Sequence, residues 1–237
     1  MWRWAVMVIL AILAVAGAVV VVVRWRLRPV DAIGRPKKFP VVSVSLLGIA
    51  AVVLAVPTVL RQREESRLGK VASVLVGARV TVHCQTFGQE FTDLSGDLGF
   101  VKFGPDGVPE HHAMIMRGPC SELRDYYGGD QAHPTPDEVI AVHVLTHESM
   151  HMRGQTNEAA TDCEAMQRDA ETAQLLGATP QEGLELARAY WLEDYPNMPD
   201  AYRSDSCKLN GSLDEHLPDP PWTSGSYVAV MLPPPGG

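Results

Sequence analysis

Two histidines and a glutamate near the middle of the chain have the types and the spacing of a hydrolytic metal site. The stretch His147-Glu148-Ser149-Met150-His151 places two imidazoles four residues apart. In an α-helix this spacing puts both side chains on one face, one turn apart, where neutral rings can bind the same tetrahedral metal ion. Glu148 lies about 100° around the helix from His147. Its carboxylate therefore flanks the metal and can take a proton from a polarised water molecule. The stretch predicts a zinc site with a general base beside it.

The residues before the histidines predict the helix that this chemistry needs. Thr135 is a suitable N-cap, Pro136 suits the first turn, and Glu138 can complete a capping box. A largely apolar run follows at residues 139–145. A helix that is apolar on most sides is buried, so we expect the two histidines to lie inside a core.

A second helix is expected directly after the first. Gly154 permits a turn, and Asn157 can cap a helix that begins at Glu158. Glu158 and Asp162 are four residues apart and therefore share one face of this helix. The sequence predicts a helical hairpin that brings these carboxylates towards the histidines.

The two motifs together, H-E-x-x-H and N-E-x-x-x-D within residues 135–177, resemble those of the gluzincin metallopeptidases, the thermolysin-like group. The resemblance implies a zincin-like domain, a Zn²⁺ cofactor and a peptide or protein substrate. It implies that Glu158 is the third zinc ligand beside His147 and His151, and that Asp162 orients His147, since metal-bound histidines usually donate their other N–H to a carboxylate. Thermolysin-like enzymes have a much longer interval before the glutamate, so Asp162 stays open as an alternative third ligand.

The charge of the chain is unevenly distributed. Residues 1–60 hold seven of the 20 Lys and Arg residues and only Asp31 of the 28 acidic residues. The rest of the chain is strongly acidic, which argues against nucleic acid as a partner.

Two apolar runs lie in the basic N-terminal part, at residues 5–23 and 41–60. Each is about long enough to cross the hydrocarbon core of a bilayer. The first run has no clear small-x-small cleavage site before Arg24, which favours a retained helix over a signal peptide. The short loop at residues 24–40 carries six Lys and Arg, more than either flank, and the positive-inside rule places it in the cytoplasm. We expect a multi-pass cell-membrane protein, anchored in the lipid bilayer by two spans, with an extracytoplasmic C-terminal domain. The opposite topology is the alternative.

The remaining chain divides into three parts. We expect a connector helix at residues 61–76, a zinc metallopeptidase-like domain at residues 77–217 and a Pro-rich tail at residues 218–237. The predicted fold class is α+β, in which two N-terminal transmembrane helices precede a zincin-like domain with a helical core.

A small antiparallel sheet is expected before the metal-site helices. Residues 79–84, 98–103 and 111–116 are strand candidates, and a turn-rich Gly-Pro-Asp-Gly separates the last two. In the gluzincin family a sheet edge beside the site binds the substrate as an added strand. The resemblance therefore makes residues 111–116 a candidate edge.

Four cysteines, all after the second apolar run, indicate an oxidising compartment. Cys84, Cys120, Cys163 and Cys207 form an even set without C-x-x-C spacing, which favours two disulfides over four buried thiols. Four cysteines allow three pairings. We predict Cys84–Cys120 and Cys163–Cys207, the second of which would tie the tail to the second metal-site helix.

Further polar residues lie near the motifs. His143 precedes His147 by one turn and is either a spare ligand, an orienting group or, as we favour, a core histidine. Hydrolysis through a tetrahedral intermediate also needs a donor for the oxyanion. The downstream candidates, which the sequence does not rank, are Tyr190, Tyr195, Tyr202, Arg203 and His216.

The sequence thus predicts a membrane-anchored zinc metallopeptidase that hydrolyses peptide or amide bonds, with Glu148 as general base. The alternative is a non-catalytic membrane-anchored binding or assembly protein whose zinc is structural or absent. A closed structural site needs four protein ligands, and Cys163, next to Asp162, is the residue that would complete one.

Overall fold

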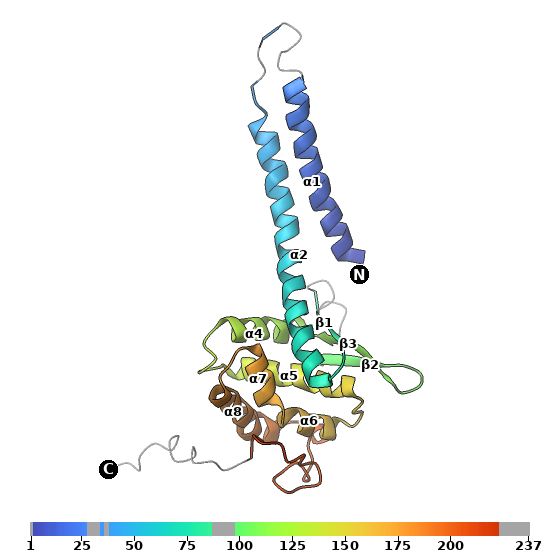
Figure 1. The fold of residues 1–237 in the computed structure, drawn as a ribbon, viewed down its shortest axis with the longest axis vertical. Coiled ribbons are helices and arrows are strands. Elements are labelled where there is room, and N and C mark those ends of the chain that lie inside the picture. Colours follow the sequence, from blue (N-terminus) through green and yellow to red (C-terminus); the bar gives the residue numbers. More distant parts are fainter. Residues whose placement is uncertain (1, 28–33, 36–37, 87–97, 223–237) are drawn as a thin grey trace, which may run out of the picture. The chain divides into compact units, whose positions relative to one another are not determined.

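A computed structural model describes residues 2–27, 34–35, 38–86 and 98–222 of the 237-residue chain. The fold is mixed α and β, and it is mostly helical with one small sheet (Figure 1). The chain divides into two compact units, Met1–Glu64 and Glu65–Gly237.

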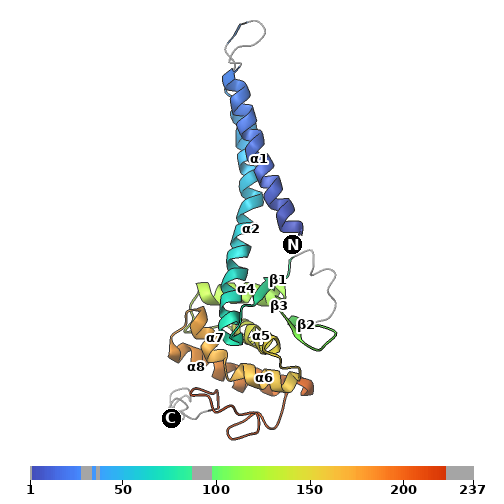
Figure 2. The ribbon, with the colours of Figure 1, turned by 45° about the vertical axis from the view of Figure 1, so that its right-hand side comes forward.

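The N-terminal unit contains two apolar helices, α1 (Trp2–Leu27) and the first part of α2 (Val41–Val76), which lie side by side (Figure 2). Gly17 of α1 faces Leu47 of α2, and the rings of Trp25 and Phe39 meet edge to face at 5.0 Å. By length and apolar composition both helices are candidates for membrane spans. Part of the expected basic loop lies outside the described residues.

The helix α2 continues without a break from Val41 to Val76. The expected second span and the expected connector at residues 61–76 therefore form one helix. Pro57 lies inside it, and Thr58 donates a hydrogen bond back to the Leu54 carbonyl at 3.0 Å.

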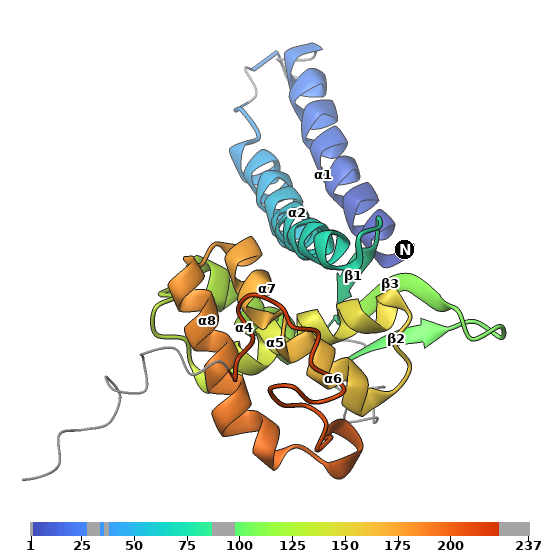
Figure 3. The ribbon, with the colours of Figure 1, turned by 60° about the horizontal axis from the view of Figure 1, so that its bottom comes forward.

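The C-terminal unit is built around α5 (Pro136–Arg153), which contacts the sheet and most of the other helices (Figure 3). Its neighbours are α4 (Arg117–Gly128), α6 (Glu158–Met166), α7 (Asp169–Leu176) and α8 (Pro180–Ala189). Nearly every residue of α5 after its first turn is buried, as its apolar run predicts.

The ends of α5 form as the sequence predicts. Thr135 Oγ1 accepts the Glu138 N–H at 3.2 Å, and a Glu138 carboxylate oxygen accepts the Thr135 N–H at 2.6 Å, which completes the capping box. Gly154 ends the helix in the left-handed region with φ 112°, where a side chain would be strained. Asn157 then caps α6 by accepting the Ala160 N–H at 2.9 Å. The turn therefore closes within a few residues.

The sheet contains β1 (Thr81–Cys84), β2 (Gly99–Phe103) and β3 (Pro109–Ile115) in the order β1-β3-β2. The β2–β3 pair is antiparallel, but β1 runs parallel to β3, so the prediction of a purely antiparallel sheet is wrong. The prediction that residues 111–116 form a sheet edge is also wrong, because β3 is the central strand. The hairpin places β2 on one side of β3, and β1 pairs with the other side.

The segment after the turn at Gly154 forms two helices, where one was expected. α6 ends at Met166 and α7 begins at Asp169. At the break, the Arg168 guanidinium forms two hydrogen bonds to Glu215, at 2.6 and 2.5 Å. The C-terminal segment, by which we mean the chain that follows α8, therefore packs against the helices at this break.

Both predicted disulfides are confirmed. Cys84–Cys120 joins β1 to α4, and Cys163–Cys207 joins α6 to the C-terminal segment. The second bond holds the chain that follows α8 close to the helices that carry the metal-site motifs.

Candidate metal centre

The helix α5 positions His147 and His151 one turn apart on a buried face. Both side chains are almost fully buried, and their rings lie 4.7 Å apart in an edge-to-face arrangement. The burial follows from the apolar residues that surround α5 on most sides.

The turn at Gly154 brings the first residue of α6 to these histidines. Glu158 Oε2 lies 3.2 Å from His147 Nε2 and 3.3 Å from His151 Nε2. The two imidazoles and the carboxylate predicted from the sequence therefore converge. Ligand atoms about 2.0–2.1 Å from one tetrahedral zinc ion are themselves about 3.3 Å apart, so these distances fit a shared metal.

The other ring nitrogens of the two histidines face hydrogen-bond acceptors. His151 Nδ1 donates to the Gln155 carbonyl at 2.8 Å, and His147 Nδ1 lies 3.5 Å from Asp162 Oδ1. Protonation at Nδ1 leaves the Nε2 lone pair available for a metal. The role of Gln155 has no signal in the sequence, because its backbone makes the contact.

Asp162 is fully buried and lies on the opposite side of His147 from Glu158. Its Oδ1 is 3.0 Å from His143 Nε2 and 3.4 Å from the Tyr190 hydroxyl. The described residues thus offer two groups that could hold a metal ion, His147, His151 and Glu158 in one and His143, His147 and Asp162 in the other. They meet at His147, which presents a different nitrogen to each carboxylate.

The charges in the centre are set by these contacts. Burial alone would lower the pKa of His143, but the charges of Asp169 and Asp162 outweigh it and raise that pKa to about 10. Burial would raise the pKa of Asp162, but the charge and hydrogen bond of His143 lower it to about 2. The pKa of His147 is set by the same opposition between burial and hydrogen bonds. Although burial opposes it, hydrogen bonds to Asp162 and Glu158 raise its pKa.

The remaining two ligand candidates favour metal binding. The hydrogen bond from His147 lowers the pKa of Glu158, so its carboxylate is ionised. Burial and the charge of His147 lower the pKa of His151, so its ring is neutral. Because the pKa of His147 is raised and that of His151 is lowered, a proton competes with a metal ion more strongly at His147 than at His151.

Glu148 is buried and packs directly against the sheet. A Cβ atom added at Gly99, the first residue of β2, would lie 2.8 Å from Glu148 Oε1 and 2.9 Å from its Cγ. Such contacts are too short to exist, so a side chain at residue 99 would force the Glu148 side chain to move. Gly99 is not among the site residues predicted from the sequence, in which its one signal is a glycine at the start of a strand.

Two aromatic rings border the histidines. Phe103 of β2 lies 6.0 Å from the ring of His151, and Tyr202 lies 5.9 Å from the ring of His147. Tyr202 belongs to the short 3₁₀ segment Asp200–Tyr202, which contacts α6. It is half-buried, whereas the ring of Tyr190 is fully buried.

The other expected oxyanion donors have different partners. The Tyr195 hydroxyl bonds to the backbone of Ser204, and Arg203 donates to the Pro196 carbonyl. His216 lies exposed beside Asp214. Among the five candidates, Tyr202 is the one with a ring contact to a histidine of the H-E-x-x-H motif.

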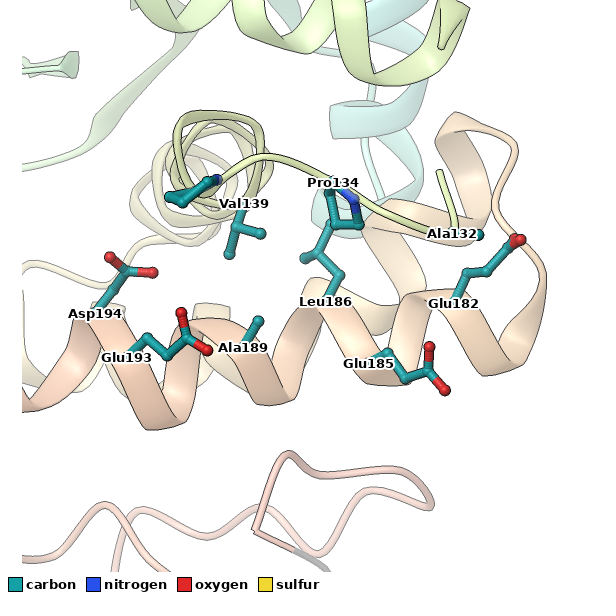
Figure 4. Close-up of a pocket in the computed structure, with 10 residues that line it drawn as sticks. Ala132, Pro134, Val139, Glu182, Glu185, Leu186, Ala189, Glu193 and Asp194 are labelled. Carbon is teal, nitrogen blue, oxygen red and sulfur yellow. The ribbon is translucent and has the colours of Figure 1, made fainter. Parts of the chain in front are cut away.

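A groove on another face of the unit lies between α8 and the segment that leads into α5 (Figure 4). Its lining is apolar at the bottom and acidic along the α8 side. The lining residues are Ala132, Pro134, Pro136, Val139, Glu182, Glu185, Leu186, Ala189, Glu193 and Asp194. None of the candidate metal ligands lines this groove.

Comparisons of the chain with protein-family models, with curated proteins and with solved structures each returned no match.

Proposed function

We propose that the chain is a membrane-anchored zinc metallopeptidase that hydrolyses peptide or amide bonds. The supporting observation is the convergence of His147 Nε2 and His151 Nε2 on Glu158 Oε2, at 3.2 and 3.3 Å. Three protein ligands leave one position open, as catalytic zinc requires. Glu148, buried and next in sequence to His147, would supply the carboxylate that takes a proton from a water molecule at that position.

Each polar residue of the centre has a role in this proposal. His147, His151 and Glu158 would hold zinc, which would lower the pKa of a water molecule to about 7. Glu148 would accept a proton from this water and deliver it to the leaving amine. Asp162 accepts a hydrogen bond from His147 Nδ1 and keeps Nε2 directed at the metal.

A peptide substrate would bind along the outer edge of β2. This strand is at the end of the sheet order, and its first residue, Gly99, packs on Glu148. In the part of the chain that the structure describes, no strand pairs with this edge. Extended peptides add to such edges through main-chain hydrogen bonds, so the scissile bond would lie close to the general base.

The catalytic unit would lie outside the cytoplasm. Two features support this location. The disulfides Cys84–Cys120 and Cys163–Cys207 are stable in an oxidising compartment. The six Lys and Arg residues at residues 24–40 would hold the loop between the spans in the cytoplasm.

A second candidate function is a membrane-anchored binding or assembly protein with a structural metal. It is favoured by the group His143, His147 and Asp162, which is entirely buried and closed to substrate. Cys163 does not complete this group, because it is disulfide-bonded to Cys207.

Metal content and hydrolysis together test the two candidates. We would purify the full-length chain in detergent micelles from an oxidising compartment and measure zinc by elemental analysis. The peptidase proposal expects about one zinc per chain, lost in His147→Ala and in Glu158→Ala. Zinc that persists in Glu158→Ala but is lost in His143→Ala would support the structural-metal candidate.

Hydrolysis is then measured on a mixture of quenched fluorescent peptides. Glu148→Gln should keep the zinc and abolish cleavage, because the amide cannot accept the proton. Full cleavage by this variant would contradict the proposed mechanism. A zinc-loaded wild type that cleaves none of the peptides would also contradict it, and so would cleavage that chelation leaves unchanged.

A further inference from the structure

His143 and Asp169 lie behind the metal centre and have no part in the proposed reaction. His143 Nδ1 is 2.8 Å from Asp169 Oδ2, and His143 Nε2 is 3.0 Å from Asp162 Oδ1. Both carboxylates have 0 % exposure. Buried charges are costly unless they are paired and hydrogen-bonded. An arrangement of this kind therefore has a structural or functional reason.

The contacts fix the His143 ring in one orientation. Each of its two ring nitrogens lies at hydrogen-bond distance from one aspartate, so the ring is held from both sides. The ring also stacks on Tyr190, with centroids 3.6 Å apart and planes inclined by 13°. Neither rotation nor a flip of the ring preserves both hydrogen bonds and the stack.

Asp162 connects this fixed ring to the ring of His147. Its Oδ1 lies within 3.0 Å of His143 Nε2, 3.4 Å of the Tyr190 hydroxyl and 3.5 Å of His147 Nδ1. One carboxylate oxygen therefore faces three donors from α5 and from the start of the π-helical segment Tyr190–Asp194. Two of these donors hold the carboxylate in place, and the third is the histidine that faces Glu158.

We propose that His143 is a positioning residue of the metal centre. Supported by Asp169 and Tyr190, it holds the Asp162 carboxylate against His147 Nδ1, and so keeps His147 Nε2 aimed at the metal. The inference rests on the metal site of the proposed function. It extends that site by one layer of residues that the two sequence motifs do not contain.

The test compares metal affinity in full-length chains purified in detergent micelles. The main variant is His143→Phe/Asp169→Asn. Phenylalanine keeps a ring against Tyr190 but donates no hydrogen bond, and the asparagine avoids an unpaired buried charge. Affinities for Zn²⁺ and Co²⁺ are measured by competition with a chromophoric chelator, and the visible spectrum of bound Co²⁺ reports the ligand geometry. We expect about 10–100-fold weaker binding and an altered Co²⁺ spectrum, in a chain whose circular dichroism is unchanged.

A thermodynamic cycle separates positioning from general destabilisation. If His143 acts through Asp162, the two changes are coupled. Adding His143→Phe/Asp169→Asn to Asp162→Asn should then weaken metal binding by less than about threefold. The matched control is Thr172→Val, which removes another buried polar group near Asp169 that donates to the Arg168 carbonyl. This control should keep the wild-type metal affinity.

A smaller change tests the same inference if the double variant does not fold. Tyr190→Phe keeps the stacked ring and removes only the hydroxyl that faces Asp162 Oδ1. Its metal affinity should fall by about 2–10-fold, a fraction of the loss typical for such an outer hydrogen-bond partner, and unchanged affinity would count against the inference.

The outcomes distinguish this inference from the proposed function. Wild-type affinity and spectrum in the folded double variant would overturn the positioning role and leave the metallopeptidase proposal standing. Fully additive losses in the cycle would overturn it equally. Complete loss of metal on changing His143, with metal kept in Glu158→Ala, would make His143 a ligand and contradict both. A wild type that binds no metal would also contradict both.

Discussion

The backbone of Gly99 lies so close to the side chain of Glu148 that a Cβ atom on Gly99 would be 2.8 Å from Glu148 Oε1. The first residue of the edge strand β2 thus forms one wall of the space that holds the proposed general base. A carboxylate in such a position is fixed by the sheet as well as by its own helix. This contact relates the strand that would bind a substrate to the residue that would activate the attacking water molecule.

Gly99→Ala should therefore displace the Glu148 carboxylate without removing the metal. Because misplacing a catalytic group by about 1 Å can cost about 100-fold in rate, we expect kcat to fall about 10–100-fold while zinc content stays at the wild-type level. Steady-state cleavage and elemental analysis measure the two quantities.

The matched control is Gly118→Ala in α4. Apart from the neighbouring backbone of α4 itself, no atom of the described residues lies within 4 Å of the Cβ that this change adds. Alanine is favoured over glycine inside a helix, so this variant should keep its activity. Wild-type kcat in Gly99→Ala would show that Glu148 is not confined by β2.

The helix ends and the histidine pair of the metal centre could be predicted from the sequence, whereas the contacts around them could not. Thr135, Gly154 and Asn157 predict where the two helices begin and end, since caps and turns depend on a few neighbouring residues. His147 and His151 lie on the same face of α5 because they are four residues apart in a helix.

Contacts between distant segments could not be derived from the sequence. The order β1-β3-β2 depends on which side of β3 receives β1, and alternating residues do not carry that information. The pairing of His143 with Asp169 needs the break between α6 and α7, which forms where Arg168 meets Glu215. His143 is buried, as favoured from the sequence, but its two carboxylate partners come from other helices.

Metal removal should lower the stability of the wild-type chain. A ligand that binds only the folded state adds about 2.7 kcal/mol when its concentration is 100 times Kd. Chelation should therefore reduce the thermal midpoint of the C-terminal unit, and added Zn²⁺ should restore it. Thermal unfolding followed by circular dichroism measures the shift.

The variant His147→Ala provides the comparison. It removes a nitrogen that lies within 3.2 Å of Glu158 Oε2, so neither chelation nor Zn²⁺ should move its midpoint. Equal shifts in wild type and variant would place the stabilising metal elsewhere.

Stability of the metal-free protein should depend on pH through His143. Its pKa in the folded chain is about 10, raised from 6.5 by Asp169 and Asp162 against the effect of burial. The stabilisation is complete below about pH 6.5, and it is lost as the pH rises through the folded pKa. In chelator, the unfolding free energy should therefore fall between pH 7 and 10, by at most about 1.4 kcal/mol per pH unit.

The variant Asp169→Asn isolates this effect. It removes one of the two charges that raise the pKa of His143, so its stability should change less over the same pH range. Denaturant titrations at each pH measure both chains. Identical slopes would mean that other groups cause the dependence.

The disulfide Cys163–Cys207 should stabilise the unit strongly. It closes a loop with a sequence separation of 44, for which loop entropy predicts about 4 kcal/mol. Cys163→Ala/Cys207→Ala should lower the unfolding free energy by about 2–5 kcal/mol, as measured by denaturant titration. A loss below about 1 kcal/mol would contradict this expectation.

We expect the Tyr202 hydroxyl to donate a hydrogen bond to the oxyanion. Its ring lies 5.9 Å from the ring of His147, on the C-terminal segment that Cys163–Cys207 joins to α6. Removing one donor to an oxyanion typically costs about 10²–10³ in kcat. Tyr202→Phe should therefore lower kcat by about this factor, with zinc content and KM close to those of the wild type.

Tyr195→Phe is the matched control for this change. Its hydroxyl accepts the Ser204 N–H at 2.9 Å and faces the Ser204 carbonyl, so its loss should reduce stability by about 1 kcal/mol and leave kcat nearly unchanged. Tyr202→Phe with wild-type kcat would exclude its hydroxyl from the reaction. If Tyr195→Phe lowered kcat as much as Tyr202→Phe, the effect would come from the fold of the C-terminal segment. A selective loss in Tyr202→Phe would instead mean that the Tyr202 hydroxyl takes part in the reaction.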